Sequence, residues 1–172
     1  MKFCCSIANN PLIEQVRSLN LKLGDYAVIG GAVMAVHGIR ENGDIDVLVK
    51  ESVYEDLKSQ GWEEKIISPE GKCVDFSVLE KGDYEVFTLI GFDPKIYNCN
   101  IDYSFDNEAL IHNADIIDGV PFVRLEDLRM FKVIYNREKD VKDVELIDKH
   151  LNISGIFQYS NLDIDDIDIV SV

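Results

Sequence analysis

Two aspartates, Asp44 and Asp46, stand one residue apart at the start of a short apolar segment and are the residues best suited to chemistry. Side chains alternate between the two faces of a strand, so both carboxylates would share one face while Ile45 and Val47 point into the core. Carboxylates that close repel each other unless a cation lies between them, and carboxylate oxygens are ligands that Mg²⁺ prefers. The pair therefore predicts a divalent-metal site.

The glycine pair Gly30-Gly31 supplies a second chemical feature, because it follows a short apolar run and precedes a segment of helical length. Glycine lets the backbone approach a ligand closely, and the N–H groups of a helix that begins at Ala32 would point at an anion. A metal site next to a phosphate-binding turn predicts nucleotide chemistry.

Each feature also has a plainer structural explanation. The Asn42-Gly43 step favours a turn, which accounts for Asp44. It does not account for Asp46, because an unpaired charge inside an apolar run is costly. The glycine pair could be an ordinary strand-to-helix turn. We favour the metal and phosphate interpretations because the two features occur together within 25 residues, from position 26 to position 50.

In these motifs the chain resembles the DNA polymerase β-like nucleotidyltransferase superfamily, and is most similar to its small bacterial and archaeal members, including toxins of the AbiEii type. Those proteins carry a Gly-Gly or Gly-Ser turn, a short helix and an Asp-x-Asp pair followed by apolar residues. Further along, they carry a helix with a lysine and then an Arg-x-Lys-Asp-x-x-Asp run. The matching residues here are Gly30, Gly31, His37, Gly38, Arg40, Asp44 and Asp46, and then Lys132, Arg137, Lys139, Asp140 and Asp143.

The resemblance implies an enzyme that moves a nucleoside monophosphate from an NTP to an acceptor, with Mg²⁺ or Mn²⁺ as cofactor. The acceptor could be a tRNA end, a protein side chain or a small molecule. The enzyme could also be the toxin of a toxin–antitoxin pair, with an antitoxin protein as its partner. The residues implied to contact the nucleotide are Gly30, Gly31, Arg40, Lys132, Lys139 and Asp143.

Structural alternatives remain open for several of these residues. Arg40 could contact a phosphate or form a surface salt bridge near Glu41. His37 stands at the end of a short apolar helix, where capping or packing is at least as good an explanation as catalysis. The segment from Lys132 to Asp143 could be a solvated helix face with charges at supporting spacings.

A third metal-binding carboxylate is harder to identify. The family often has Glu-Val-Asp in a neighbouring strand, and here Phe87 stands in the place of that aspartate. Glu85 lies on the same strand face as Phe87 and could substitute, while Asp75 and Asp102 are the other candidates. We favour Glu85, so that Asp44, Asp46 and Glu85 form the predicted catalytic and metal-binding set. The alternative function is a degenerate domain that binds nucleotide or a protein partner without turnover.

Composition restricts the class of protein. The 172 residues are 47% hydrophobic with a formal net charge of −15, which argues against a general polyanion binder and lowers the case for tRNA. A local basic patch of Lys132, Arg137, Lys139 and Lys142 could still bind a strand end. No apolar run approaches the ~18 residues that span a bilayer, so we expect a cytoplasmic protein without membrane contact. The cysteines show no zinc-ligand spacing and are expected to be free thiols: Cys4, Cys5, Cys73 and Cys99.

The order of expected elements predicts an α/β (α+β) fold of the nucleotidyltransferase type, a mixed sheet flanked by helices with closing helices at the C-terminus. We expect one domain over residues 1–151 and an acidic tail over residues 152–172. The expected strands are 26–29, 45–49, 62–67, 73–79 and 84–90, and then a hairpin around Asp118-Gly119 whose return strand is 121–123. The expected helices are 11–19, 32–37, 52–60, 107–114, 125–135 and 139–151.

Overall fold

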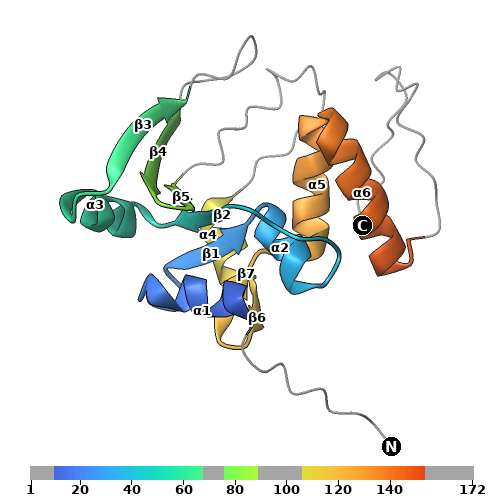
Figure 1. The fold of residues 1–172 in the computed structure, drawn as a ribbon, viewed down its shortest axis with the longest axis horizontal. Coiled ribbons are helices and arrows are strands. Elements are labelled where there is room, and N and C mark those ends of the chain that lie inside the picture. The colour runs from blue at the N-terminus through green and yellow to red at the C-terminus, as the bar shows by residue number, and fades with distance from the viewer. Residues whose placement is uncertain (1–9, 68–75, 89–105, 154–172) are drawn as a thin grey trace, which may run out of the picture.

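The computed structural model describes residues 10–67, 76–88 and 106–153. Within these residues seven strands form one mixed sheet in the order β3-β4-β5-β2-β1-β7-β6, with helices packed around it (Figure 1). The predicted fold class is therefore confirmed. The strands are β1 Tyr26–Ile29, β2 Ile45–Val49, β3 Glu63–Ile67, β4 Phe76–Lys81, β5 Tyr84–Phe87, β6 Asp115–Ile117 and β7 Val120–Phe122. The helices are α1 Pro11–Ser18, α2 Gly31–Val36, α3 Glu51–Ser59, α4 Asn107–His112, α5 Leu125–Tyr135 and α6 Glu138–Leu151.

The centre of the sheet is its most apolar part. Strand β1 is buried along its whole length, and in β2 every residue except Asp46 is buried. β1 and β2 run antiparallel, whereas β2 pairs with β5 in parallel and β1 pairs with β7 in parallel. A parallel sheet is normally covered on both faces, which explains why nearly all of β1 and β2 is apolar. Asp46 is thus a charged side chain at the centre of the core sheet.

Helix α2 connects the sheet to the C-terminal helices. It begins at Gly31, directly after β1, and packs against β1, β2 and α5. Helix α5 ends at Tyr135 and is capped by Asn136, whose φ of 48° is left-handed, and α6 begins two residues after this cap. Asn commonly tolerates this conformation, so the short link turns α6 back along α5. The resulting α5–α6 hairpin lies beside α2 (Figure 1).

Most element boundaries agree with the sequence. Strands β1 and β2 and helix α5 have the expected bounds, and the Asp118-Gly119 hairpin forms with positive φ at both turn residues, 48° and 79°. Strand β4 extends to Lys81 because Lys81 still pairs with Tyr84 across the turn. Helix α4 ends at His112, two residues before its expected end.

Several predictions lie outside the described residues. Asp75, Asp102 and the four cysteines are among them, as is residue 154 onward in the expected acidic tail. The division into one domain and a tail therefore stays a prediction. None of the helices in the described ranges combines the length and the apolarity needed to cross a membrane. The cytoplasmic location also stays a prediction.

Candidate functional site

Asp46 and Glu85 lie directly opposite each other on neighbouring strands. They are paired positions in the parallel β2–β5 ladder, so their side chains leave the sheet on the same face. Asp44 precedes β2 and is exposed, whereas Asp46 and Glu85 are half-buried. The structure therefore places the favoured third carboxylate beside the aspartate pair. Its role as a metal ligand stays a prediction.

The pKa values of the two strand carboxylates are raised, mainly by burial. Burial and then the negative charges of Asp44 and Glu85 together raise the pKa of Asp46 to about 7, against opposing effects of Lys139 and Lys132. Burial also raises the pKa of Glu85, assisted by Asp44 and Glu80 and opposed by Lys65 and Lys139. A bound cation would remove this repulsion, as expected for a metal site.

The donor set suits a hard divalent cation, because Asp44, Asp46 and Glu85 offer only carboxylate oxygens. Across residues 10–67, 76–88 and 106–153, however, no three His, Cys, Asp or Glu side chains already converge as a metal-binding group. Asp44 is exposed, so its carboxylate is accessible to a cation. The residues fit Mg²⁺ or Mn²⁺ by chemistry, and the ion would draw the carboxylates together.

The glycine turn makes room for the carboxylate of Asp46. Gly30 has φ 71° and ψ −147°, a backbone conformation nearly restricted to glycine. A Cβ on Gly30 would lie 2.0 Å from Asp46 Oδ2, and one on Gly31 would lie 2.1 Å from Asn42 Oδ1 and 3.1 Å from Arg40 Nη2. The space that the glycines leave is thus filled by the chain's own polar side chains. Phosphate binding at the turn stays a prediction.

Asn42 is a residue whose role the sequence did not indicate beyond a turn. Its side-chain amide donates a hydrogen bond to the backbone carbonyl of Asp44, while its Oδ1 lies against Gly31. Asn42 therefore links the glycine turn to the residue that precedes β2. The Asn-Gly dipeptide was the available signal, and it predicted the bend without predicting this contact.

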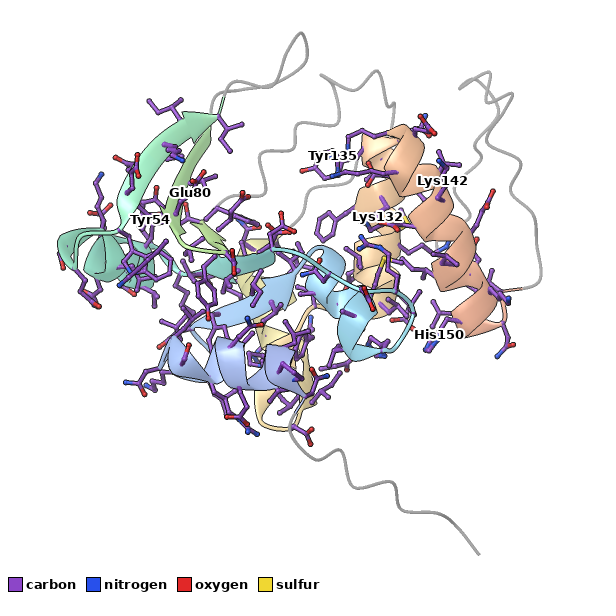
Figure 2. The ribbon with its side chains drawn as sticks, viewed as in Figure 1. Tyr54, Glu80, Lys132, Tyr135, Lys142 and His150 are labelled. Carbon is purple, nitrogen blue, oxygen red and sulfur yellow. The ribbon has the colours of Figure 1, made fainter. Side chains whose placement is uncertain are left out.

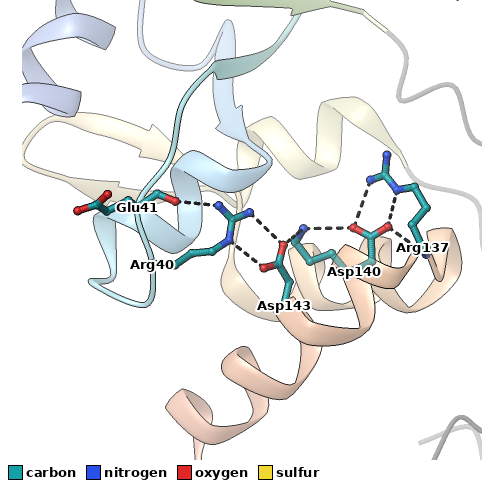
Figure 3. A network of polar contacts seen from close by, with 6 residues as sticks. Arg40, Glu41, Arg137, Asp140 and Asp143 are labelled. Carbon is teal, nitrogen blue, oxygen red and sulfur yellow. Dashed lines mark hydrogen bonds and ion pairs between the residues drawn. The ribbon is translucent and has the colours of Figure 1, made fainter.

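A buried network of ion pairs joins the loop after α2 to the α5–α6 hairpin (Figure 3). Arg40 donates to both oxygens of Asp143, at 2.8 and 3.0 Å, and to the backbone carbonyl of Glu41. Lys132 donates to Asp143 at 2.6 Å and lies 3.4 Å from Asp140, and Arg137 pairs with Asp140. Lys132, Asp140 and Asp143 are buried.

This burial corrects one of the structural alternatives. Asp140 and Asp143 of α6 do not belong to a solvated helix face, because Asp140 is fully buried and Asp143 is 5% exposed. Nor does Arg40 pair with the carboxylate of Glu41, since its partner on Glu41 is the backbone oxygen. Burial alone would raise the pKa of Asp143, but hydrogen bonds from Arg40 and Lys132 outweigh it and lower that pKa. Asp143 therefore remains ionised between its two cations.

The predicted basic patch is largely neutralised. Lys132 and Arg137 pair with buried aspartates, and Lys142 pairs with Glu138 along α6. Figure 2 shows Lys132 and Lys142 on the C-terminal helices. Lys139 is exposed in the first turn of α6, and its charge lowers the pKa of both Asp46 and Glu85. Lys139 is therefore an exposed member of the patch whose charge acts on both carboxylates.

His37 serves packing in this structure. It caps the C-terminal end of α2, and its ring meets the edge of His150 of α6 at a centroid distance of 5.7 Å. Its Nε2 is buried and has no hydrogen-bond partner among the described residues. Burial lowers the pKa of His37, as does His150, against Asp115 and Glu126. These contacts agree with the packing role weighed from the sequence.

A separate depression of about 490 Å³ lies between Leu23, Lys50, Asp106, His112 and neighbouring residues. None of the predicted site residues lines it. It is therefore separate from the carboxylate site.

Comparison with known proteins gives limited information. No protein-family model matches the chain, and no curated protein matches it. Among solved structures, the chain is similar to a "putative nucleotidyltransferase" from Thermotoga maritima, with a TM-score of 0.44 and 20% identity. The match covers 85% of this chain and 96% of the other.

The contact between Gly30 and Asp46 predicts an unusually sensitive glycine. Gly30→Ala should lose roughly 1–3 kcal/mol of unfolding free energy from backbone strain alone, and more from the clash with the Asp46 carboxylate. Gly43→Ala is the control, because a Cβ there meets nothing within 4 Å. Chemical denaturation measures both. Equal stability of the two variants would contradict the contact.

The raised pKa of Asp46 predicts that ionised Asp46 lowers the free energy of unfolding in a pH-dependent way. Its folded-state pKa, about 7, lies above the unfolded value of 3.8, so the folded state loses stability as pH rises through this interval. In chelator at pH 8, Asp46→Asn should be more stable than the wild type by roughly 2–4 kcal/mol, and the gain should vanish below pH 4. Glu55→Gln, which removes an exposed carboxylate of α3, should change stability by less than about 0.5 kcal/mol. A gain that does not depend on pH would refute the assignment.

Proposed function

We propose that this protein is a divalent-metal-dependent nucleotidyltransferase, which moves a nucleoside monophosphate from an NTP to an acceptor. The observation that carries the proposal is the pairing of Asp46 with Glu85 on the central strands, next to a turn that only glycine can form. Half-buried carboxylates that repel each other are costly to a fold. In metal-dependent phosphoryl transfer, such carboxylates hold the metal.

In this mechanism Asp44, Asp46 and Glu85 would hold Mg²⁺ or Mn²⁺. The ion would supply positive charge to offset the negative charge of the triphosphate and of the pyrophosphate leaving group. Lys139 of α6, whose charge lowers the pKa of Asp46 and Glu85, would bind a phosphate oxygen. Arg40, 33% exposed at its side chain, reaches the turn from the loop after α2. These residues orient the triphosphate, and orientation with charge stabilisation accounts for most of the catalysis in this reaction class.

The charge distribution of the chain favours some of the possible acceptors over others. The cations expected to bind a tRNA end are mostly paired with carboxylates, and the chain carries a formal net charge of −15. A polyanion gains affinity mainly from unpaired Lys and Arg. We therefore place a protein side chain or a small molecule ahead of tRNA as the acceptor. A toxin role with an antitoxin partner is a further proposal within the same activity.

Transfer of labelled nucleotide tests the proposal. The wild type, incubated with each α-labelled NTP, Mn²⁺ or Mg²⁺ and cell extract, should label an acceptor, preferentially in the protein or small-molecule fraction. The double variant Asp44→Ala/Asp46→Ala should lose transfer by at least about a hundredfold, because it removes the metal-holding charges. Glu55→Gln should transfer normally. Equal labelling by the wild type and the double variant would overturn the proposal.

The effect of Glu85→Gln distinguishes the proposed enzyme from a domain that binds nucleotide without turnover. If Glu85 completes the metal site, this variant should lose transfer by roughly a hundredfold while its affinity for metal–NTP falls much less, since the two aspartates still hold one ion. Calorimetry measures binding, and the labelling assay measures transfer. Unchanged transfer would remove Glu85 from the site. Metal–NTP binding by the wild type without transfer to any acceptor fraction would favour the degenerate, non-catalytic alternative.

A further inference from the structure

The guanidinium of Arg40 is fixed on three sides. Its Nε and Nη2 donate to the two oxygens of Asp143, at 2.8 and 3.0 Å, and its Nη1 donates to the backbone carbonyl of Glu41 at 2.8 Å. Two parallel hydrogen bonds from one guanidinium to one carboxylate set the plane of the group as well as its position. The carboxylate is the rigid partner, because the Asp143 side chain is 7% exposed, against 33% for that of Arg40.

This fixed position lies against the glycine turn. Arg40 Nη2 is 3.1 Å from the point that a Cβ of Gly31 would occupy. A guanidinium has five N–H groups, and the contacts to Asp143 and Glu41 use three of them, so two have no partner among the described residues and remain available to an anion. Arg40 can therefore bind a phosphate without giving up Asp143.

Lys132 occupies the other side of Asp143 and cannot act in the same way. It is 7% exposed and donates to Asp143 and to Asp140, so its ammonium group is enclosed. Arg40, Lys132 and Arg137 are thus all paired with the carboxylates of Asp140 and Asp143. The charge of Lys132 does lower the pKa of Asp46.

We infer that Asp143 is a positioning residue: it holds Arg40 against the Gly30-Gly31 turn, and through Lys132 it connects that turn to the α5–α6 hairpin. Arg40 is the group that meets the triphosphate, and Lys132 and Asp143 act through it instead of touching the nucleotide. The ligand in this inference rests on the proposed function, whereas the contact between Asp143 and Arg40 does not.

A matched pair of variants tests the inference. Asp143→Asn removes the charge that holds Arg40. The control, Asp148→Asn, weakens another ion pair of the α5–α6 hairpin, in which Arg129 Nη2 of α5 lies 3.0 Å from Asp148 of α6. In calorimetric titration with Mn²⁺–ATP, Asp143→Asn should raise the Kd about tenfold and Asp148→Asn less than about twofold. Equal weakening in both variants would mean general loosening of the hairpin and would overturn the inference.

A double-variant cycle distinguishes positioning from a separate structural role. Arg40→Lys keeps the charge but loses the bidentate contact with Asp143, so its Kd for Mn²⁺–ATP should rise as much as that of Asp143→Asn. The double variant should bind no worse than either single variant, because Asp143 acts through Arg40. Additive losses would overturn the inference. If Asp143→Asn does not fold, a normal Kd in Arg40→Lys overturns it and a tenfold rise supports it.

One readout is independent of the nucleotide. In protein labelled with ¹⁵N-arginine, the Arg40 Nε–H resonance, identified by its loss in Arg40→Lys, should exchange slowly with water. Exchange should accelerate at least about tenfold in Asp143→Asn and remain slow in Asp148→Asn. Unchanged exchange in Asp143→Asn would show that Asp143 does not hold Arg40. A wild type that binds no metal–NTP would overturn the proposed function and the ligand assigned to Arg40, while this measurement still decides the contact.

Discussion

The carboxylate of Asp46 lies where a side chain on Gly30 would be, and the site depends on this close approach. The β1–β2 register sets it, because Ile29 is paired with Asp46 and Gly30 follows Ile29 directly. Only a residue without a Cβ fits there, and the positive φ of Gly30 then directs the chain into α2. A charged group at the centre of the sheet and the sharp turn after β1 are thus one structural feature.

The two halves of the site have opposite charge and come from distant parts of the chain. The sheet contributes the carboxylates of Asp44, Asp46 and Glu85, whereas the α5–α6 hairpin contributes Lys132 and Lys139. The lysines partly offset the repulsion among the carboxylates, which stabilises the sheet site before any metal binds. Arg40 joins the halves, since it reaches Asp143 across 103 residues of sequence. A triphosphate with its metal would lie between these groups.

Local patterns in the sequence predicted most of the fold. Alternation and apolar runs predicted the bounds of β1, β2 and α5, and alternation placed Glu85 on the same strand face as Phe87. Only the observed β2–β5 register shows that Asp46 shares this face. The burial of Asp140 and Asp143 was not predictable in this way. Their spacing on α6 is equally typical of an exposed helix face, and only the tertiary contacts with Lys132 and Arg40 distinguish the two cases. Asn42 was missed for the same reason, because its contact with Gly31 depends on how the loop folds back.

The most direct measurement for the central claim is anomalous diffraction from crystals grown with Mn²⁺ and a non-hydrolysable NTP. We expect a manganese peak with oxygens of Asp46 and of Asp44 or Glu85 about 2.1 Å away, and triphosphate density between this peak and the Gly30-Gly31 turn. A nucleotide bound elsewhere, or a manganese peak away from these carboxylates, would contradict that claim.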